Sequence, residues 1–324
     1  MRTLDRLVRT EKKYKIMSAK NYIGIDIGGT NVKIGIVSRE GDLLEKTKYP
    51  TAELLQGEGF IPNFCAALKT HLTANPQIDA VGIGIPGLLA KDRRSVIRTA
   101  NIPSLSKVGI LDELEKAFPK IKFRLENDAK VACLGEYYFS EHELPENFLM
   151  VTLGTGVGGA AIVDGKLFIG GSGNGVEIGH MLGDKDKIYE EYLSKNAMVK
   201  YTLNLLENGS YEKSLLHKIP ADQLTAKDIE SALKKGDRAA KKAYKKFGKW
   251  LGRCLVSSMR VLDIHTILLG GGVAKTFKYL EEPMYEAIHE HLGEYYTDDL
   301  VIMQASLANE AGIIGAAALN FEDK

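Results

Sequence analysis

One short arrangement of strands and glycines occurs twice in this chain. The first copy, residues 22–37, reads as a buried strand, a turn at Gly28 and Gly29, and a second buried strand. The second copy, residues 148–163, repeats that order around Gly154-Thr155-Gly156, and in each copy a tight turn and a third strand follow. Duplicated hairpins with glycines at matching turns predict two similar domains that face each other across a cleft.

The composition is that of a globular protein with room for two domains. The chain has 324 residues, of which 44% are hydrophobic and 26% are charged. A formal net charge of +1 gives no electrostatic argument for a nucleic-acid or membrane partner, and no apolar run reaches the roughly 18 residues of a spanning helix. The three cysteines are scattered, which favours a reduced compartment, so we expect a cytoplasmic protein.

The spacing of apolar residues predicts the remaining elements and two domains. Helices are expected over 59–74, 111–118, 128–140, 221–262 and 311–319, and strands over 79–85, 121–125 and 266–269. This order indicates a mixed α/β fold with an N-terminal domain over 21–127 and a larger C-terminal domain over 128–307. The small-residue helix within 308–324 is expected to pack back on the first domain. Residues 1–20 form a basic leader that we expect to be disordered, with a targeting role as the alternative.

The second glycine turn formally matches a dinucleotide-binding fingerprint. Residues 154–159 have the spacing G-x-G-x-x-G after a strand, but the fingerprint requires a helix next, because the helix N-terminus holds the pyrophosphate. Here the strand Ala160–Val163 and a hairpin turn follow instead. The dinucleotide interpretation therefore fails, and no G-x-x-x-x-G-K-[ST] segment offers a P-loop either.

Glycine turns between strands can still bind phosphate, because consecutive exposed backbone N–H groups form an anion-binding nest. Asp26 precedes the first turn and suits a magnesium ion or its waters. An ordinary hairpin is the alternative for a single motif, but two matched copies and a third glycine run favour phosphate. The predicted phosphate-binding residues are Gly28, Gly29, Thr30, Gly154, Thr155, Gly156, Gly270, Gly271 and Gly272.

Two polar segments could carry chemistry. Asn127 and Asp128 stand at a strand end just before a helix, where either one could cap that helix. A carboxylate there could instead accept a proton from a substrate hydroxyl, and spacing leaves both interpretations open. Glu177 and His180 follow a glycine-rich stretch, and their spacing of three places them on one face, where they could bind sugar hydroxyls or serve the fold.

Together these segments resemble the sugar kinases of the repressor, open reading frame, kinase (ROK) family. The matches occur in the family's order and span nearly the whole chain after residue 20: Asp26–Thr30, Gly82–Gly87, Glu126–Ala129, Gly154–Gly159, Glu177–Met181 and Leu269–Val273. The resemblance implies an actin-like ATPase fold of two ribonuclease-H-like domains. It also implies that ATP, magnesium and a sugar meet in the cleft, and it suggests a homodimer.

The resemblance also implies residue roles. Asp128 would be the general base that takes the proton from the sugar's primary hydroxyl. The ring hydroxyls would be held by Asn101, Asn127, Glu177 and His180, with help from the backbone of Gly87. Glu190 resembles the family's later sugar-binding glutamate, with Glu191 as its rival. Many family members carry a zinc-binding cysteine cluster after the histidine, but residues 182–188 contain no cysteine, so we expect no zinc and a free His180.

The favoured function is therefore an ATP-dependent hexokinase of glucokinase type. An N-acetylhexosamine kinase (for N-acetylglucosamine or N-acetylmannosamine) and a fructose kinase are the near alternatives, because the motifs recognise hydroxyls that these sugars share. A sugar-sensing regulator without catalysis is a different class, but twenty leader residues are too few for a helix-turn-helix domain. A structural actin-like filament protein would not need the Glu177 and His180 pair.

Overall fold

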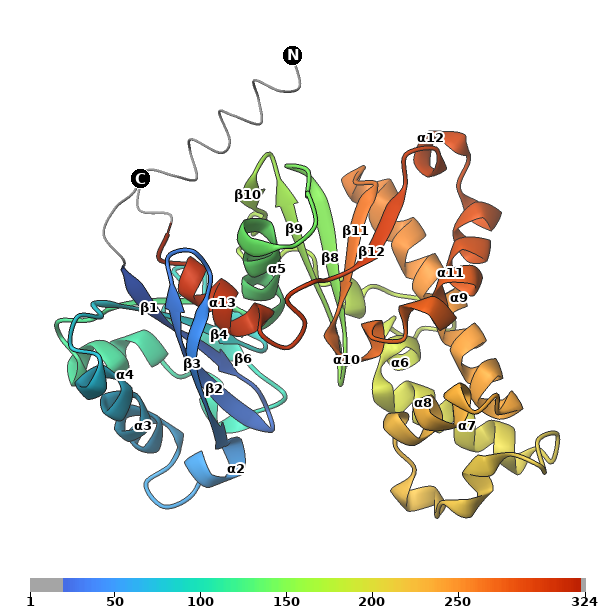
Figure 1. Ribbon diagram of the computed structural model, residues 1–324, viewed down its shortest axis with the longest axis horizontal. Helices are drawn as coiled ribbons and strands as arrows, with labels where there is room; N and C mark the ends of the chain where they lie inside the picture. The colour runs from blue at the N-terminus through green and yellow to red at the C-terminus, as the bar shows by residue number, and fades with distance from the viewer. Residues whose placement is uncertain (1–19, 322–324) are drawn as a thin grey trace.

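The computed structural model describes residues 20–321, and its core is two five-stranded sheets (Figure 1). The predicted leader, apart from Lys20, and residues 322–324 lie outside the described residues. The first sheet has the order β3-β2-β1-β4-β7. Its strands are β1 Asn21–Ile27, β2 Asn31–Ser38, β3 Leu43–Pro50, β4 Ala80–Ile85 and β7 Lys122–Asn127. The first three pair antiparallel as the predicted meander, and β4 and β7 continue parallel to β1.

The second sheet repeats this topology in the order β10-β9-β8-β11-β12. It consists of β8 Phe148–Leu153, β9 Val157–Val163, β10 Lys166–Leu167, β11 Thr266–Gly270 and β12 Val301–Gln304. Again three antiparallel strands are followed by two parallel ones. The central strands β1, β4, β8 and β11 are apolar and buried because both sheet faces are covered. The repeat predicted from the glycine turns is thus a repeat of whole sheets.

Helices cover the outer faces of both sheets. Helices α3 Phe60–Ala74 and α4 Ile110–Ala117 pack their apolar sides on the first sheet, with the short helix α2 Thr51–Leu54 beside β3. Helices α9 Arg238–Leu262 and α11 Phe277–His291 do the same for the second sheet (Figure 1). The predictions over 59–74 and 111–118 are confirmed. No helix within residues 20–321 is long and apolar enough to cross a membrane.

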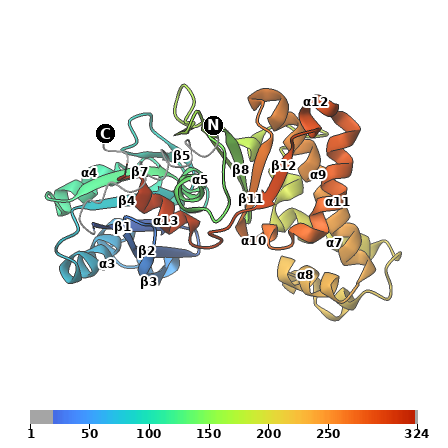
Figure 2. The same ribbon diagram turned by 45° about the horizontal axis from the view of Figure 1, so that its top comes forward.

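Two further helices, α5 Asp128–Phe139 and α13 Ala311–Ala318, lie between the sheets (Figure 2). Helix α5 packs on β9, and α13 packs on β1, β4 and α5. A Cβ built on Gly315 would lie 1.6 Å from the carbonyl oxygen of Val131, and one on Gly24 would lie 1.9 Å from that of Ile313. Only glycine permits such backbone approach. Helix α13 thus packs closely on strands of the first sheet, whereas the division into domains stays a prediction.

One helix prediction needs correction. The segment 221–262 is not continuously helical but contains a 3₁₀ turn at Ala221–Gln223, then α8 Ala226–Lys234 and α9. Gly236, with φ of +84°, ends the first helix, and the Asp237 side chain caps the second through the N–H groups of Ala239 and Ala240. The apolar spacing continues across this break, which hid it. Lys241, Lys242, Lys245 and Lys246 are exposed, as predicted.

The remaining elements were not predicted, and apart from α7, with 13 residues, each is too short for periodicity to reveal. A small hairpin, β5 Leu88–Leu89 and β6 Val96–Arg98, follows β4. Helices α6 Glu190–Leu193, α7 Lys195–Glu207, α10 Gly271–Ala274 and α12 Glu294–Thr297 belong to the second half of the chain. Three further 3₁₀ turns lie at Pro103–Leu105, Ile178–His180 and Leu215–Lys218.

Candidate active site

The first glycine turn joins β1 to β2 and is braced from outside the hairpin. Within the turn, the N–H of Gly28 donates to the carbonyl of Asn31 at 3.0 Å. Thr51, buried at the start of α2, donates its hydroxyl to the Gly28 carbonyl at 2.6 Å and its N–H to the Thr30 carbonyl at 3.0 Å. Asn101 lies against the turn, because a Cβ atom built on Gly29 would be 3.2 Å from the Cβ of Asn101. The turn therefore has a fixed shape.

Asp26, the predicted magnesium ligand, has a partner that sequence reasoning missed. It pairs across the hairpin with Lys33, and the Lys33 ammonium lies 2.5 Å from the Asp26 carboxylate. Residues 20–321 contain no cluster of three or more His, Cys, Asp or Glu side chains that could hold a metal. Magnesium, however, is commonly held by one or two carboxylates together with substrate phosphates and water. Asp26 fits that kind of site.

The second glycine turn joins β8 to β9 and is braced by charged residues. The Gly154 N–H donates to the Gly156 carbonyl at 2.9 Å, and the Lys195 N–H, at the start of α7, donates to the Gly154 carbonyl at 3.0 Å. Glu190 accepts the N–H of Val157 at 2.9 Å. Of the two rival glutamates, Glu190 thus reaches this turn, whereas Glu191 accepts the N–H of Ile188 within its own exposed loop.

The third glycine run adjoins the second turn. Strand β11 pairs with β8, so that Gly270 is opposite Thr152. Gly271 has a φ of +82°, and a Cβ there would lie 2.4 Å from the carbonyl oxygen of Leu153. These contacts bring Gly270–Gly272 beside Gly154–Gly156 at one end of the second sheet. Two of the three predicted phosphate-binding segments are therefore neighbours.

Asp128 begins α5, and the two interpretations of its segment separate in the structure. Asn127 is the cap, because its side-chain oxygen accepts the N–H groups of Ala129 and Lys130. Its amide group also donates to the Gly87 carbonyl at 3.3 Å. Capping is thus performed by Asn127, while the Asp128 carboxylate accepts the adjacent Ala129 N–H at 2.9 Å.

The electrostatic surroundings of Asp128 include charged groups from both the first glycine turn and the predicted sugar side. Burial raises the pKa of its carboxyl to about 6, and the negative charges of Asp26 and Glu177 add to that rise, against the lowering effect of the Ala129 N–H. Asp26 belongs to the first glycine turn, and Glu177 to the predicted sugar side. A carboxylate with a pKa near neutrality can take up a proton and release it again at physiological pH.

Glu177 and His180 lie together on a 3₁₀ turn. The Glu177 carboxylate is 3.3 Å from Nδ1 of His180, and the side chains are 36% and 62% exposed. Both are therefore accessible to a ligand. Other predicted site residues at the surface are Gly29, Thr30, Asn101, Thr155 and Gly271.

The loop 170–175, which precedes Glu177, is fixed to the first half of the chain. Asn174 exchanges two hydrogen bonds with the backbone of Leu89, at 2.9 and 3.0 Å. The Gly173 carbonyl accepts from two cations, the buried Lys130 at 3.1 Å and the guanidinium of Arg93. Sequence reasoning missed these residues because each partner comes from a distant segment and none belongs to a recognisable motif.

A buried ion pair supports Arg93 and Lys130. Nε of Arg93 lies 2.9 Å from the carboxylate of Glu126, the last residue but one of β7. Burial lowers the pKa of the Lys130 ammonium, while the negative charge of Glu126 opposes that effect. Removing one member of such a buried network leaves an uncompensated charge, so these residues set the position of the loop.

The loop 182–188, where the family resemblance suggested a cysteine cluster that this chain lacks, is held by hydrogen bonds and an aromatic stack. The Gly183 N–H donates to the Lys187 carbonyl at 2.7 Å, and the Tyr192 hydroxyl donates to the Asp184 carbonyl at 2.5 Å. The Tyr192 ring stacks on Trp250 of α9, with centroids 3.9 Å apart. This stack links the loop to the core of the second half and fixes the start of α6, where Glu190 lies.

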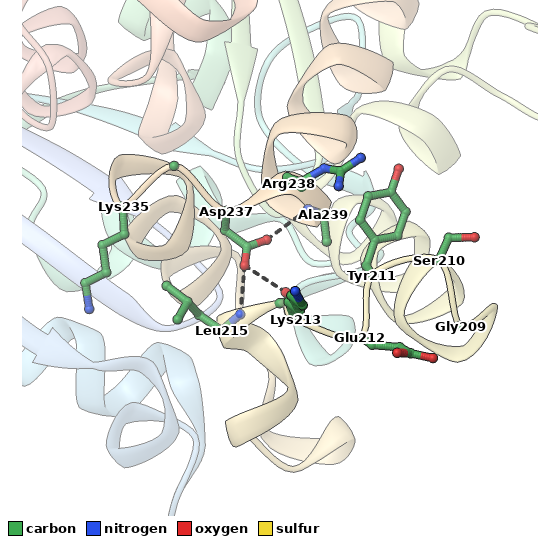
Figure 3. Close-up of a pocket in the computed structure, with 12 residues that line it drawn as sticks. Gly209, Ser210, Tyr211, Glu212, Lys213, Leu215, Lys235, Asp237, Arg238 and Ala239 are labelled. Carbon is green, nitrogen blue, oxygen red and sulfur yellow. Dashed lines mark hydrogen bonds between the residues drawn. The ribbon is translucent and has the colours of Figure 1, made fainter.

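A hollow elsewhere in the molecule contains none of the predicted site residues. It has a volume of about 490 Å³ and is lined by residues 209–215 and 235–239 (Figure 3). Its central carboxylate, Asp237, is fully engaged, because it accepts from the Ser214 hydroxyl and from the N–H groups of Leu215, Ala239 and Ala240. We therefore place the candidate site at the glycine turns and not in this hollow.

Comparison with known proteins identifies the fold and the family. Two matched sheets with glycine turns and interposed helices define the actin-like ATPase fold, which the solved structures below share. Residues 22–322 match the family model described as "ROK family", and the chain belongs to this family.

Several relatives align over almost their whole length. A structure from Cytophaga hutchinsonii, named as a candidate sugar kinase, is 43% identical with a TM-score of 0.86, over 93% of this chain and 100% of that one. A ROK family glucokinase from Streptomyces griseus, solved with glucose and AMPPNP, is 28% identical with a TM-score of 0.79, over 92% and 98%. A glucokinase of Thermotoga maritima is 28% identical, over 92% of this chain and 96% of that protein. An N-acetyl-D-glucosamine kinase of Aliivibrio fischeri is 26% identical, over 93% of this chain and 100% of that protein.

Proposed function

We propose that the protein is an ATP-dependent sugar kinase that transfers the γ-phosphoryl group to the 6-hydroxyl of a hexose, with glucose as the first candidate. The observation that carries this proposal is the position of Asp128. Its carboxyl, with a pKa raised to about 6, is influenced both by Asp26 at the first glycine turn and by Glu177 on the sugar side. A base so placed can act on a hydroxyl brought to a phosphate.

In the proposed reaction, Asp128 accepts the proton of the sugar hydroxyl while that oxygen attacks the γ-phosphorus. The bond from phosphorus to the β–γ bridging oxygen breaks, and ADP leaves with the electron pair. The protein contributes mainly positioning and charge stabilisation, as expected for phosphoryl transfer. The two glycine turns supply backbone N–H groups for the phosphates. Asp26 would hold magnesium, directly or through water, and the ion would neutralise charge on the phosphate oxygens.

The residues proposed to bind the sugar differ in what they can donate or accept. Asn127 can only donate, because its side-chain oxygen caps α5. Glu177 accepts, and His180 can donate or accept, so together they suit adjacent ring hydroxyls. Asn101, the backbone of Gly87, and Glu190 complete the proposed sugar site, and the tied loop 170–175 holds Glu177 in place.

The identity of the sugar is the finer part of the proposal. Similarity to proteins named glucokinase supports glucose, and similarity to an N-acetyl-D-glucosamine kinase supports an N-acetylhexosamine as the second candidate. The residues proposed to bind the sugar recognise hydroxyls common to both, and fructose stays within the same class. We further propose a homodimer, which light scattering of the purified protein would test.

The test is ADP release from MgATP across a panel of glucose, mannose, fructose, N-acetylglucosamine and N-acetylmannosamine. We expect turnover with at least one hexose, highest with glucose, and loss of turnover when EDTA removes magnesium. Sugar binding by calorimetry without ADP release on any sugar would instead indicate a sensor. Sedimentation of filaments with nucleotide alone, in the absence of any sugar binding, would indicate a structural protein.

A further inference from the structure

A lysine side chain that makes no ion pair within residues 20–321 lies beside the second glycine turn. Lys195 is the first residue of α7, and its backbone N–H is used by the Gly154 carbonyl. Its side chain extends toward the third glycine run, where a Cβ built on Gly272 would lie 3.1 Å from Nζ. Within residues 20–321 this ammonium has no hydrogen-bond or ion-pair partner, and the side chain is half-buried.

At the first turn, by contrast, the lysine has an ion-pair partner. There, Lys33 lies 2.5 Å from the carboxylate of Asp26, so its charge is matched inside the hairpin. The carboxylate of Glu190 also lies at the second turn, but it is directed to the N–H of Val157, beside Gly156. Lys195 therefore places a positive charge beside two glycine segments whose N–H groups also favour an anion.

We propose that Lys195 is a nucleotide-binding residue that contacts the phosphates of ATP and ADP, between Gly154–Gly156 and Gly270–Gly272. The inference rests on the proposed function and assigns to this chain a phosphate ligand outside the sequence motifs. Half-burial strengthens the interaction, because a charge with restricted access to water is less screened than one in bulk solvent. Lys195 anchors the nucleotide and takes no part in proton transfer.

The test compares Lys195→Met with Lys195→Arg and with Lys200→Met, an exposed lysine further along the same helix. Calorimetry measures the Kd of ATP, ADP and adenosine for each variant in the presence of magnesium. We expect Lys195→Met to weaken ATP and ADP about 10- to 100-fold, the loss typical of one charged hydrogen bond, and to leave adenosine unchanged. Arginine should restore most of the affinity, and Lys200→Met should bind as the wild type does.

The outcomes separate this inference from the proposed function. Wild-type protein that binds ADP, together with an equal Kd for Lys195→Met, would overturn the role of Lys195 alone. An equal loss of ADP and adenosine would also overturn it, because the effect would then be structural. Wild-type protein that binds no nucleotide would remove the proposed function and, with it, this inference. An unchanged KM for the sugar in Lys195→Met would support the assignment to the phosphates.

Discussion

The two glycine turns have the same backbone design and different surroundings. The first turn is braced by neutral groups, Thr51 and Asn101, and its carboxylate and lysine neutralise each other within the hairpin. The second turn is braced by Glu190 and by the start of α7, which brings Lys195, whose ammonium has no ion-pair partner among residues 20–321. The two hairpins thus share a backbone design but differ in where their charged residues lie: within the hairpin at the first turn, and on neighbouring elements at the second.

This difference indicates a division of roles between the halves. The Asp26 carboxylate influences Asp128, so the first turn is coupled to the proposed base. Lys195 lies at the second turn, with its side chain beside the third glycine run. We infer that the first turn serves the reacting end of the nucleotide and the second turn anchors the rest of its phosphates. The predictions below probe that division, from the largest expected effect to the smallest.

Asp128→Asn should lower kcat by about 10²- to 10⁴-fold, the usual contribution of a general base, with little change in the Kd of ADP. The fold should persist, because the native pKa of about 6 exceeds the ordinary value of 3.8. Ionisation of Asp128 therefore costs stability at neutral pH, and the amide removes that cost. A melting temperature at or above that of the wild type, measured with the kinetics, is the control. Near-wild-type turnover would refute the base assignment.

The pH dependence of kcat/KM should show an acid limb near pH 6. Protonated Asp128 cannot accept a proton, so kcat/KM falls as the pH drops below about 6 and is roughly tenfold lower near pH 5. Asn in place of Asp128 should remove this limb from the residual activity. A limb that persists in the variant belongs to another group.

Asn174→Ala should raise the KM for the sugar about fivefold to tenfold while the KM for ATP stays within about twofold. The substitution removes two hydrogen bonds to Leu89 and releases the loop that precedes Glu177. Asn196→Ala, at an exposed position on α7, is the matched control. An equal rise in both KM values would show that the loop supports the whole site and not the sugar side alone.

Thr51→Val should lower the free energy of unfolding by about 1 kcal/mol or somewhat more, measured by urea denaturation. The change keeps the shape of a buried side chain but removes the donor to the Gly28 carbonyl. Thr70→Val, which removes a hydroxyl contact to Ala66 on an exposed helix face, should have almost no effect. An equal effect of both variants would mean that the first turn needs no external brace.

Much of the architecture could be predicted from the sequence because it is periodic. The two hairpins, their third strands, the two helices on the first sheet and the small-residue helix all follow from apolar spacing and glycines. The helix break before Asp237 could not be predicted, because apolar residues keep their helical spacing across it. The hairpin of β5 and β6 could not be predicted either, because its strands have only two and three residues.

The site was only partly accessible to such reasoning. Asp26, Asp128 and Glu177 could be named because each belongs to a motif, and the assignment of their roles stays a prediction. Lys33 and Arg93 could not be named, because each has significance only through a partner across a hairpin or distant in the chain. Lys195 could not be named because its significance comes from the distant Gly272, beside which its side chain lies. Asn127 illustrates the limit, since its segment permitted two roles and only the hydrogen bonds to Ala129 and Lys130 chose the cap.

The central claim, that the two turns divide reaction from anchoring, is tested most directly by steady-state kinetics of Asp26→Asn and Lys195→Met side by side. We expect Asp26→Asn to lower kcat about 10- to 100-fold, as loss of a carboxylate that supports a metal does, with a small change in the KM for ATP. Lys195→Met should raise the KM for ATP by a similar factor and leave kcat within about threefold. The account would be contradicted if kcat and the KM for ATP changed by similar factors in both variants.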